Sequence, residues 1–271
     1  MTNATQHLKS HSLRNAFFGV GVIVSITFII LFLNNKRDVF LPRQEMNNAA
    51  KFWQEAIASE GKGEFAPAIL DFLHYIEANG EDKEVFRHLS ELYIKTGQFN
   101  QALENAQQYT KVAPHSPDSF FRLGVVYHLL GQETKAIESY QKSVDIDPKF
   151  AEAYFILGFL SETDGKLLDA INYYKKAVEA DPKHAKAYYN LGNAYAGLEK
   201  DDDAIRSYQA AIANDQNYTD AFVNLSILLT KNGKYAEAIR YLDEARILGY
   251  QPPEEFLREL DVYREKQAVK K

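Results

Sequence analysis

The sequence predicts an all-α protein in which helical hairpins stack side by side, preceded by one membrane-spanning helix. Two observations predict this arrangement: the body of the chain matches itself at a fixed period of 34 residues, and an uncharged apolar run lies near its start. The charge distribution supports the division, because residues 1–48 carry five basic and two acidic side chains while the remainder carries 26 and 35. A basic, apolar start joined to an acidic body indicates two physical environments.

Residues 16–33 read AFFGVGVIVSITFIILFL, eighteen residues without a charge. A helix of this length spans roughly 27 Å, close to the thickness of the hydrocarbon core of a bilayer. Arg14 precedes the run, Arg37 follows it, and no small-residue cleavage site of a signal peptide comes after it. We therefore predict a short tail at 1–15, an uncleaved transmembrane anchor at 16–33 and a juxtamembrane tether at 34–48.

The body of the chain repeats one pattern of residues every 34 positions. Leu-Gly pairs recur at 123–124, 157–158 and 191–192, and the same step separates alanines, tyrosines and prolines. These recurring residues are Ala102, Ala136, Ala170, Ala204, Ala238, Tyr140, Tyr174, Tyr208, Pro114, Pro148 and Pro182. A fixed period of this length is the signature of stacked repeats, in which no single unit buries its own apolar face.

Each unit has the pattern of two antiparallel helices. In residues 151–184, Tyr154, Leu157 and Ser161 fall on one helical face at i, i+3 and i+7. Gly165 then interrupts the first helix, and an Asp-Pro pair ends the second. Glycine and alanine let two helix backbones approach closely, while the aromatic side chains fill the space between them.

This pattern resembles the tetratricopeptide repeat family, whose units carry an aromatic residue, Leu-Gly, Tyr, Ala, a second aromatic residue and Pro. The resemblance covers about three quarters of the chain and implies a right-handed superhelical solenoid. The outer units depart from the pattern, as expected of repeats that face water on one side, and the fifth unit has Glu199 at the turn glycine. The predicted units are 49–82, 83–116, 117–150, 151–184, 185–218 and 219–252. Residues 253–271 are predicted to form a C-terminal capping helix and a tail. The apolar face of the capping helix would carry Phe256, Leu257, Leu260 and Tyr263.

The resemblance implies that the first helix of each unit lines a concave face, with a binding groove at repeat positions 2, 5, 9, 12 and 13. At positions 5 and 9 the central units carry aromatic and aliphatic side chains, and the units that follow carry neutral amides. The predicted groove residues are Phe121, Val125, Phe155, Phe159, Tyr189, Asn190, Asn193 and Asn224. Apolar side chains on a rigid concave scaffold favour an amphipathic helix or an extended apolar peptide, whose backbone the amides would bond. The alternative interpretation is that the position-5 aromatic residues pack against their neighbours.

The sequence offers little support for catalysis, a cofactor or nucleic-acid binding. The chain has no cysteine, which excludes disulfides, thiolate metal sites and a thiol nucleophile. It contains no phosphate-binding Gly-rich loop, HExxH or GxSxG motif, and its net charge of −6 argues against a nucleic-acid partner. His88 with Glu91 makes an incomplete ligand pair, and the acidic cluster 201–203 lacks the spacing of an EF-hand. We therefore predict no enzyme activity, no cofactor and no metal site.

Together these features predict a membrane-anchored scaffold or assembly factor that holds a protein or peptide client in its groove beside the bilayer. The alternative is a structural protein that self-assembles at the membrane without a transient client. Independently of these two functions, Gly21 and Ser25 form a small-xxx-small pair through which two anchors could approach as a homo-oligomer. The chain resembles bacterial inner-membrane proteins with one N-terminal anchor and a tetratricopeptide body, which predicts that location. The basic tail before the anchor favours an extracytoplasmic body.

Overall fold

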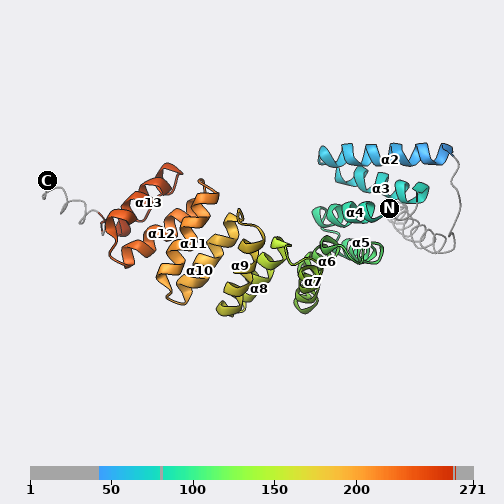
Figure 1. Cartoon of the computed structure of the whole chain (residues 1–271). Helices are drawn as coiled ribbons and strands as arrows, with labels where there is room; N and C mark the ends of the chain where they lie inside the picture. The colour runs from blue at the N-terminus through green and yellow to red at the C-terminus, as the bar shows by residue number, and fades with distance from the viewer. Residues whose placement is uncertain (1–42, 80–81, 259, 261–271) are drawn as a thin grey trace, which may run out of the picture. The chain divides into compact units, whose positions relative to one another are not determined.

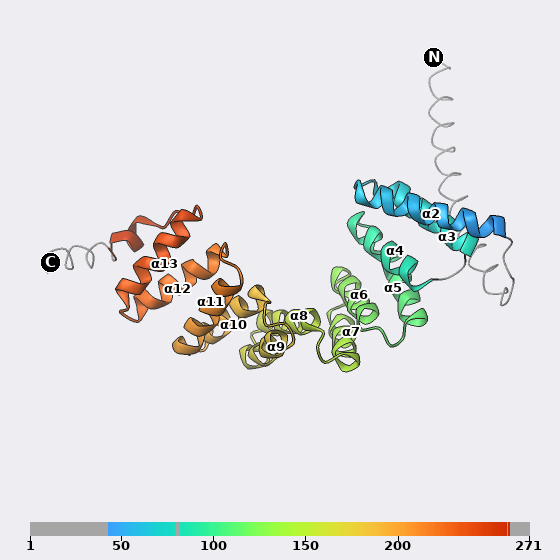
Figure 2. The same ribbon diagram turned by 45° about the horizontal axis from the view of Figure 1, so that its top comes forward.

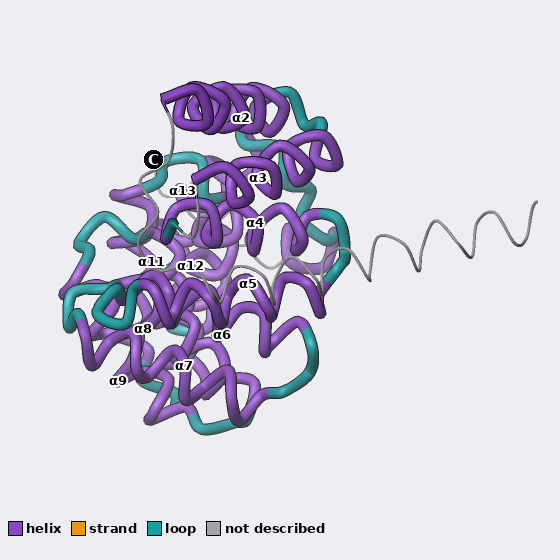
Figure 3. Tube along the Cα trace, turned by 90° about the vertical axis from the view of Figure 1, so that its right-hand side faces the viewer, coloured by secondary structure: helices purple, strands orange, loops and turns teal. Residues whose placement is uncertain are grey.

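The computed structural model describes residues 43–79, 82–258 and 260. All regular secondary structure in this part of the chain is α-helical, and Figure 3 shows its helices joined by loops with no strand among them. The chain divides into two compact units, Met1–Pro114 and His115–Lys271.

The first unit contains two antiparallel helix pairs in its described part (Figure 1). They are α2 (Arg43–Gly61) with α3 (Phe65–Asn79), and α4 (Lys83–Lys95) with α5 (Phe99–Val112). The single tryptophan of the chain, Trp53 on α2, joins the two pairs. Its ring centroid lies 5.3 Å from that of Phe72 and 5.1 Å from that of Tyr75, both on α3, and 5.6 Å from that of His88 on α4.

The second unit contains four antiparallel pairs, which Figures 1 and 2 show from two directions. They are α6 (Pro117–Leu129) with α7 (Glu133–Ile146), α8 (Ala151–Thr163) with α9 (Leu167–Ala180), α10 (Ala185–Gly197) with α11 (Asp201–Asn214), and α12 (Thr219–Lys231) with α13 (Tyr235–Ile247). Successive pairs contact each other between α7 and α8, between α9 and α10, and between α11 and α12. Each pair therefore buries the face that its neighbour presents.

Each helix pair lies within one of the six predicted ranges, except that helix α2 begins earlier. It begins at Arg43, so the last residues of the predicted tether at 34–48 belong to this helix. The physical reason is that no glycine or proline separates Arg43 from the body of α2, so nothing in the sequence ends the helix there. The six pairs are divided between the two compact units, two in the first, which ends at Pro114, and four in the second.

The predicted membrane anchor at 16–33 and the tail at 1–15 lie outside the described residues. Within the described residues, no helix combines the length and apolar character that crossing a bilayer requires. The right-handed superhelical path and the anchor therefore stay predictions.

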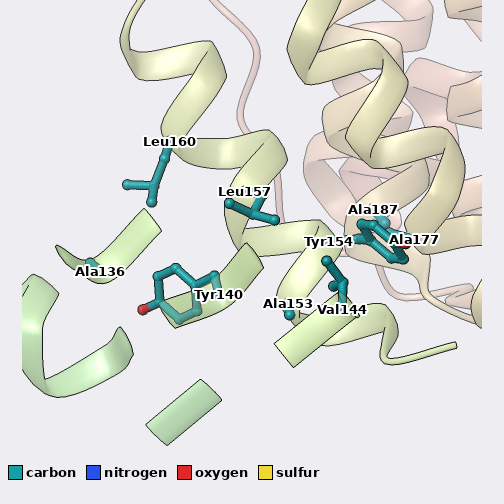
Figure 4. Close-up of a cluster of buried hydrophobic side chains, with 9 residues drawn as sticks. All are labelled: Ala136, Tyr140, Val144, Ala153, Tyr154, Leu157, Leu160, Ala177 and Ala187. Atoms are coloured by element: carbon teal, nitrogen blue, oxygen red, sulfur yellow. The ribbon is translucent and has the colours of Figure 1, made fainter. Parts of the chain in front are cut away.

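The recurring glycines and tyrosines mark where the two helices of a pair come closest. A Cβ atom at Gly158 on α8 would lie 2.6 Å from ring carbons of Tyr174 on α9, so only glycine leaves room for this ring. The same approach joins Gly124 to Tyr140 and Gly192 to Tyr208. Figure 4 shows the buried cluster to which Tyr140 belongs, formed mainly by α7 and α8.

A C-terminal segment covers the last helix pair. Residues 254–258 are helical, and Phe256 and Leu257 pack against the core that contains Leu242 of α13 and Leu260. Leu260 is fully buried, so the apolar face of α12 and α13 is closed at this end of the unit. Tyr263, the fourth residue of the predicted capping face, lies outside the described residues.

The turn inside α10–α11 contains a strained residue. Most pairs turn at a glycine with positive φ, such as Gly165 at 74° between α8 and α9. Glu199 adopts φ 56° at the equivalent turn and is the only non-glycine residue in the described part of the chain with positive φ. A side chain in this left-handed conformation costs roughly 1–2 kcal/mol, because its Cβ crowds the backbone.

Glu199→Gly is expected to raise the free energy of unfolding by about 1 kcal/mol, because glycine adopts this conformation without steric strain. Urea unfolding followed by circular dichroism measures the change. The matched control is Gly165→Glu, where nothing lies within 4 Å of an added Cβ and only the backbone is strained. It should lower stability by a similar amount. Equal stability of the wild type and Glu199→Gly would contradict the strain.

Candidate functional site

The eight predicted groove residues all lie on the first helices of the pairs in the second unit. Residues at the same repeat position occupy the same place on each of these helices, so they share one face of the stacked pairs. We call this set the first-helix face. It consists of Phe121 and Val125 on α6, Phe155 and Phe159 on α8, Tyr189, Asn190 and Asn193 on α10, and Asn224 on α12.

The aromatic residues at repeat position 5 pack largely within the unit. The ring centroid of Phe155 lies 6.0 Å from that of Tyr174 and 4.9 Å from that of His184. All three position-5 rings are half-buried, which agrees with the interpretation that they pack against their neighbours. The equivalent contacts join Phe121 to Tyr140 and Phe150, and Tyr189 to Tyr208 and Tyr218.

The open apolar surface of the face comes from repeat position 9. Phe159 is 43% exposed, one helical turn after the packed Phe155, and Val125 at the same repeat position is half-buried. Ile227 on α12 also occupies position 9 and is 48% exposed, although it was not among the predicted groove residues. Exposed large apolar side chains that recur at one repeat position form a surface that a partner can cover.

The amides of α10 and α12 are partly engaged within the unit. Tyr208 Oη donates a hydrogen bond to Asn193 Oδ1 at 2.8 Å. Asn224 Nδ2 donates to Asn193 Oδ1 and to Tyr189 Oη, both at 3.1 Å. These bonds use one end of each amide and leave Asn193 Nδ2 and Asn224 Oδ1 as a donor and an acceptor for a ligand.

A second polar network lies one pair earlier. Tyr174 Oη donates to Glu162 Oε2 at 2.6 Å and accepts from Asn190 Nδ2 at 3.4 Å. Burial, followed by the hydrogen bond and charge of Glu162, raises the pKa of Tyr174 above its ordinary value, while the bond from Asn190 acts in the opposite direction. The hydroxyl therefore stays protonated at neutral pH.

His184 lies immediately before α10, and its ring contacts Phe155 of the first-helix face. Its Nδ1 accepts a hydrogen bond from the backbone N–H of Ala187 at 3.3 Å, and its Nε2 lies 3.4 Å from Glu152 Oε2. This contact with His184 lowers the pKa of Glu152, against the effect of burial. His184 was not among the groove residues predicted from the sequence. The signal was the repeat itself, because Phe150, His184 and Tyr218 hold the same position before successive first helices.

The chemistry of this face suits binding. It presents aromatic rings, aliphatic side chains and amides, which act through van der Waals contact and hydrogen bonding. Among residues 43–79, 82–258 and 260, no three or more His, Cys, Asp or Glu side chains gather where they could hold a metal ion.

Hairpins of nearly constant length, stacked so that equivalent helices share a face, define a helical repeat protein. Family models described as tetratricopeptide repeat match residues 163–219 and 207–240, and a model described as TPR repeat matches residues 126–165. Residues 126–240 of the chain are therefore tetratricopeptide repeats, which confirms the resemblance stated from its sequence. Such repeats are scaffolds typical of protein–protein interaction.

Several solved structures share this fold. The crystal structure of MamA is 28% identical, with a TM-score of 0.54, and the match covers 59% of this chain and 94% of that one. YrrB, described as a TPR protein with an unusual peptide-binding site, is 20% identical, with a TM-score of 0.54 and coverage of 71% and 97%. PilF of Pseudomonas aeruginosa is 20% identical, with a TM-score of 0.58 and coverage of 68% and 86%. No curated protein sequence is significantly similar to this chain.

Proposed function

We propose that the chain is a membrane-anchored scaffold that binds an extended, apolar segment of a client protein on the first-helix face. The observation that carries this proposal is the exposed Phe159, followed by an unused donor on Asn193 in the next repeat and an unused acceptor on Asn224 in the repeat after that. An extended peptide offers a free backbone N–H and C=O to such a pair, whereas a helix has already bonded its own. The amides therefore favour the extended peptide over the amphipathic helix.

The neutral character of the face supports an apolar client. The amides carry no charge, and burial keeps the tyrosine hydroxyls behind them protonated. Covering Phe159 removes apolar surface from water, at roughly 25 cal/mol per Å². Affinity should consequently depend little on salt, because no charge pair is screened.

The membrane anchor and the location belong to the same proposal. Residues 16–33 would hold the repeats at a bacterial inner membrane, with the body on the extracytoplasmic side. Anchoring raises the local concentration of the scaffold around clients that assemble at the bilayer. YrrB supports a peptide client only in the sense that this fold presents a peptide-binding site in another protein.

Phe159→Asp is expected to weaken client binding at least tenfold while the thermal midpoint stays near that of the wild type. The side chain is 43% exposed, so a charge there is solvated in the free protein but buried under the client. Peptides selected on the immobilised full chain from a random library would serve as ligands, with affinities measured by fluorescence anisotropy.

The matched control is Leu168→Asp. Leu168 lies on α9, outside the first-helix face, and is 68% exposed. The same change of charge there should leave peptide affinity unchanged. Equal loss in both variants, or no loss in Phe159→Asp, would contradict the placement of the client.

The alternative function, self-assembly without a client, has a different outcome in the same variants. Analytical ultracentrifugation would then find concentration-dependent oligomers that persist in Phe159→Asp, and peptide selection would yield no ligand. Peptide binding that is lost in Phe159→Asp favours the client-binding scaffold.

A further inference from the structure

A second candidate site lies between α9, α10 and α11, away from the first-helix face. It is an open hollow of about 240 Å³. Val178 and Leu191 supply its aliphatic walls, Tyr188 and Tyr195 supply aromatic walls, Ser207 borders it from α11, and Lys175 borders it from α9. Glu179, Asp203 and Arg206 complete the lining, so the hollow combines aliphatic and aromatic walls with charged groups of both signs.

Helix α10 presents opposite sides to the two sites. Tyr188, Leu191 and Tyr195 follow one another at i, i+3 and i+7 and line the hollow. At about 100° per residue, Tyr189 and Asn193 point to the other side of the helix. A ligand in the hollow would thus leave the first-helix face free.

The equivalent place in the last pair is filled by a tyrosine of the chain itself. Tyr241 on α13 holds the repeat position that Ser207 holds on α11. Its ring centroid lies 6.2 Å from that of Phe222, and its Oη accepts a hydrogen bond from Gln209 Nε2 at 3.4 Å. Phe222 and Gln209 hold the repeat positions of Tyr188 and Lys175 at the hollow.

The equivalent place in the pair before the hollow is filled in the same way. Tyr173 on α9 packs against the buried cluster that contains Val144, Tyr154 and Leu157. Lys176 Nζ lies 5.5 Å from the ring centroid of Tyr154 and 6.0 Å from that of Tyr173, so the two rings are neighbours. Val144 and Leu157 hold the repeat positions of Val178 and Leu191. Of three equivalent places within the second unit, two therefore contain a phenol ring.

Tyr195 takes up part of the space at the third place but does not close it. In the α8–α9 pair, where Tyr173 fills the equivalent place, the repeat position of Tyr195 is held by the smaller Ser161. The hollow that remains, about 240 Å³, exceeds the ~150 Å³ of an engineered cavity that binds benzene. One aromatic ring therefore fits.

We propose that this hollow binds the phenol ring of a tyrosine side chain from a partner protein, in the place where the neighbouring pairs hold Tyr173 and Tyr241. The ring packs between Tyr188 and the aliphatic walls, as Tyr241 packs beside Phe222. Its hydroxyl accepts a hydrogen bond from Lys175 Nζ, as Tyr241 accepts one from Gln209. This site is independent of the client on the first-helix face, so the scaffold holds two partners on opposite sides of α10.

The first test titrates the methyl-labelled full chain with 4-methylphenol and with N-acetyl-tyrosinamide in NMR experiments. Saturable shifts are expected for the methyl groups of Val178 and Leu191, with Kd on the order of a few millimolar for ligands this small. The methyl groups of Val144 and Leu157 are the internal control and should not move, because Tyr173 fills their site. Absent or unsaturable shifts at Val178 and Leu191, or equal shifts at both pairs, would overturn the proposal. Binding of 4-methylphenol without N-acetyl-tyrosinamide would overturn the protein origin of the ring and assign the hollow to a free phenol.

A double variant closes the hollow. Tyr195→Ser with Ser207→Tyr copies the pair Ser161 and Tyr173 from the filled place and should abolish the shifts at Val178. Saturable binding that survives this exchange in a folded variant, with wild-type helix content by circular dichroism, would overturn the proposal.

The reverse exchange opens the filled place and keeps the test decisive if the first variant fails to fold. Ser161→Tyr with Tyr173→Ser copies the hollow into the α8–α9 pair and should create saturable shifts of the methyl groups of Val144 and Leu157 on addition of 4-methylphenol. A folded variant that binds nothing there would contradict the assignment of the ring to this repeat position.

Discussion

Tyr174→Ala is expected to lower the free energy of unfolding by about 3–5 kcal/mol, the range for truncating a large buried aromatic side chain. Tyr174 is fully buried, and its ring lies against Gly158 at a distance that leaves no space for a Cβ. Truncation opens a cavity between α8 and α9 that neither backbone can close. Glu162 and Asn190 also lose the hydroxyl that they share.

The matched control for this prediction is Tyr173→Ala on the same helix. Tyr173 is half-buried, so truncating it removes less apolar surface from the interior. Urea unfolding followed by circular dichroism should give a loss less than half that of Tyr174→Ala. Similar losses in the two variants would contradict the assignment of Tyr174 to the core of the pair.

Above pH 10 the chain is expected to lose stability steeply. Burial is the main cause that raises the pKa of Tyr140, Tyr174 and Tyr208 above the ordinary value, and it raises the pKa of Tyr218 to about 12. Tyrosines of the unfolded chain titrate near pH 10. Between pH 10 and the native pKa values, the unfolded chain releases protons that the native chain retains. The free energy of unfolding therefore falls as pH rises, by up to about 1.4 kcal/mol per pH unit for each such tyrosine.

The stabilisation from these tyrosines is fully present below pH 10, so the loss has a defined onset. Tyrosinate absorbance and circular dichroism, recorded on the same samples, should change together as the core opens. Tyr174→Phe should make the fall in the free energy of unfolding less steep, because one proton fewer is involved. A free energy of unfolding that stays constant between pH 10 and pH 12 would contradict this account.

The helix pairs could be predicted because the residues that define them recur locally. A glycine such as Gly165 ends a helix through its own backbone conformation, whatever packs around it. The 34-residue recurrence of glycine, alanine and tyrosine reflects the close approach of the two helices within one pair. The turn at Glu199 was predictable even without glycine, since the pattern on both sides fixed its place. The division into two compact units at Pro114 could not be predicted, because the same proline recurs as Pro148 and Pro182 inside the second unit.

The side-chain partners on the first-helix face could not be predicted from residue types. Phe155 has the same identity whether it faces a client or packs against His184, and this packing depends on a residue 29 positions later. Asn193 and Asn224 were predicted to bind a peptide backbone, and half of their hydrogen-bonding capacity is used by each other and by tyrosine hydroxyls. These partners come from other helices, so they become visible only once the pairs are stacked.

The packing of Trp53 among Phe72, Tyr75 and His88 gives the chain an optical label confined to one half of it. Tryptophan emission follows the environment of the first unit, whereas circular dichroism follows the helices of both. Melting of the second unit alone would be nearly silent in the emission. Recording the two signals on one unmodified sample therefore separates a single cooperative transition from two successive ones.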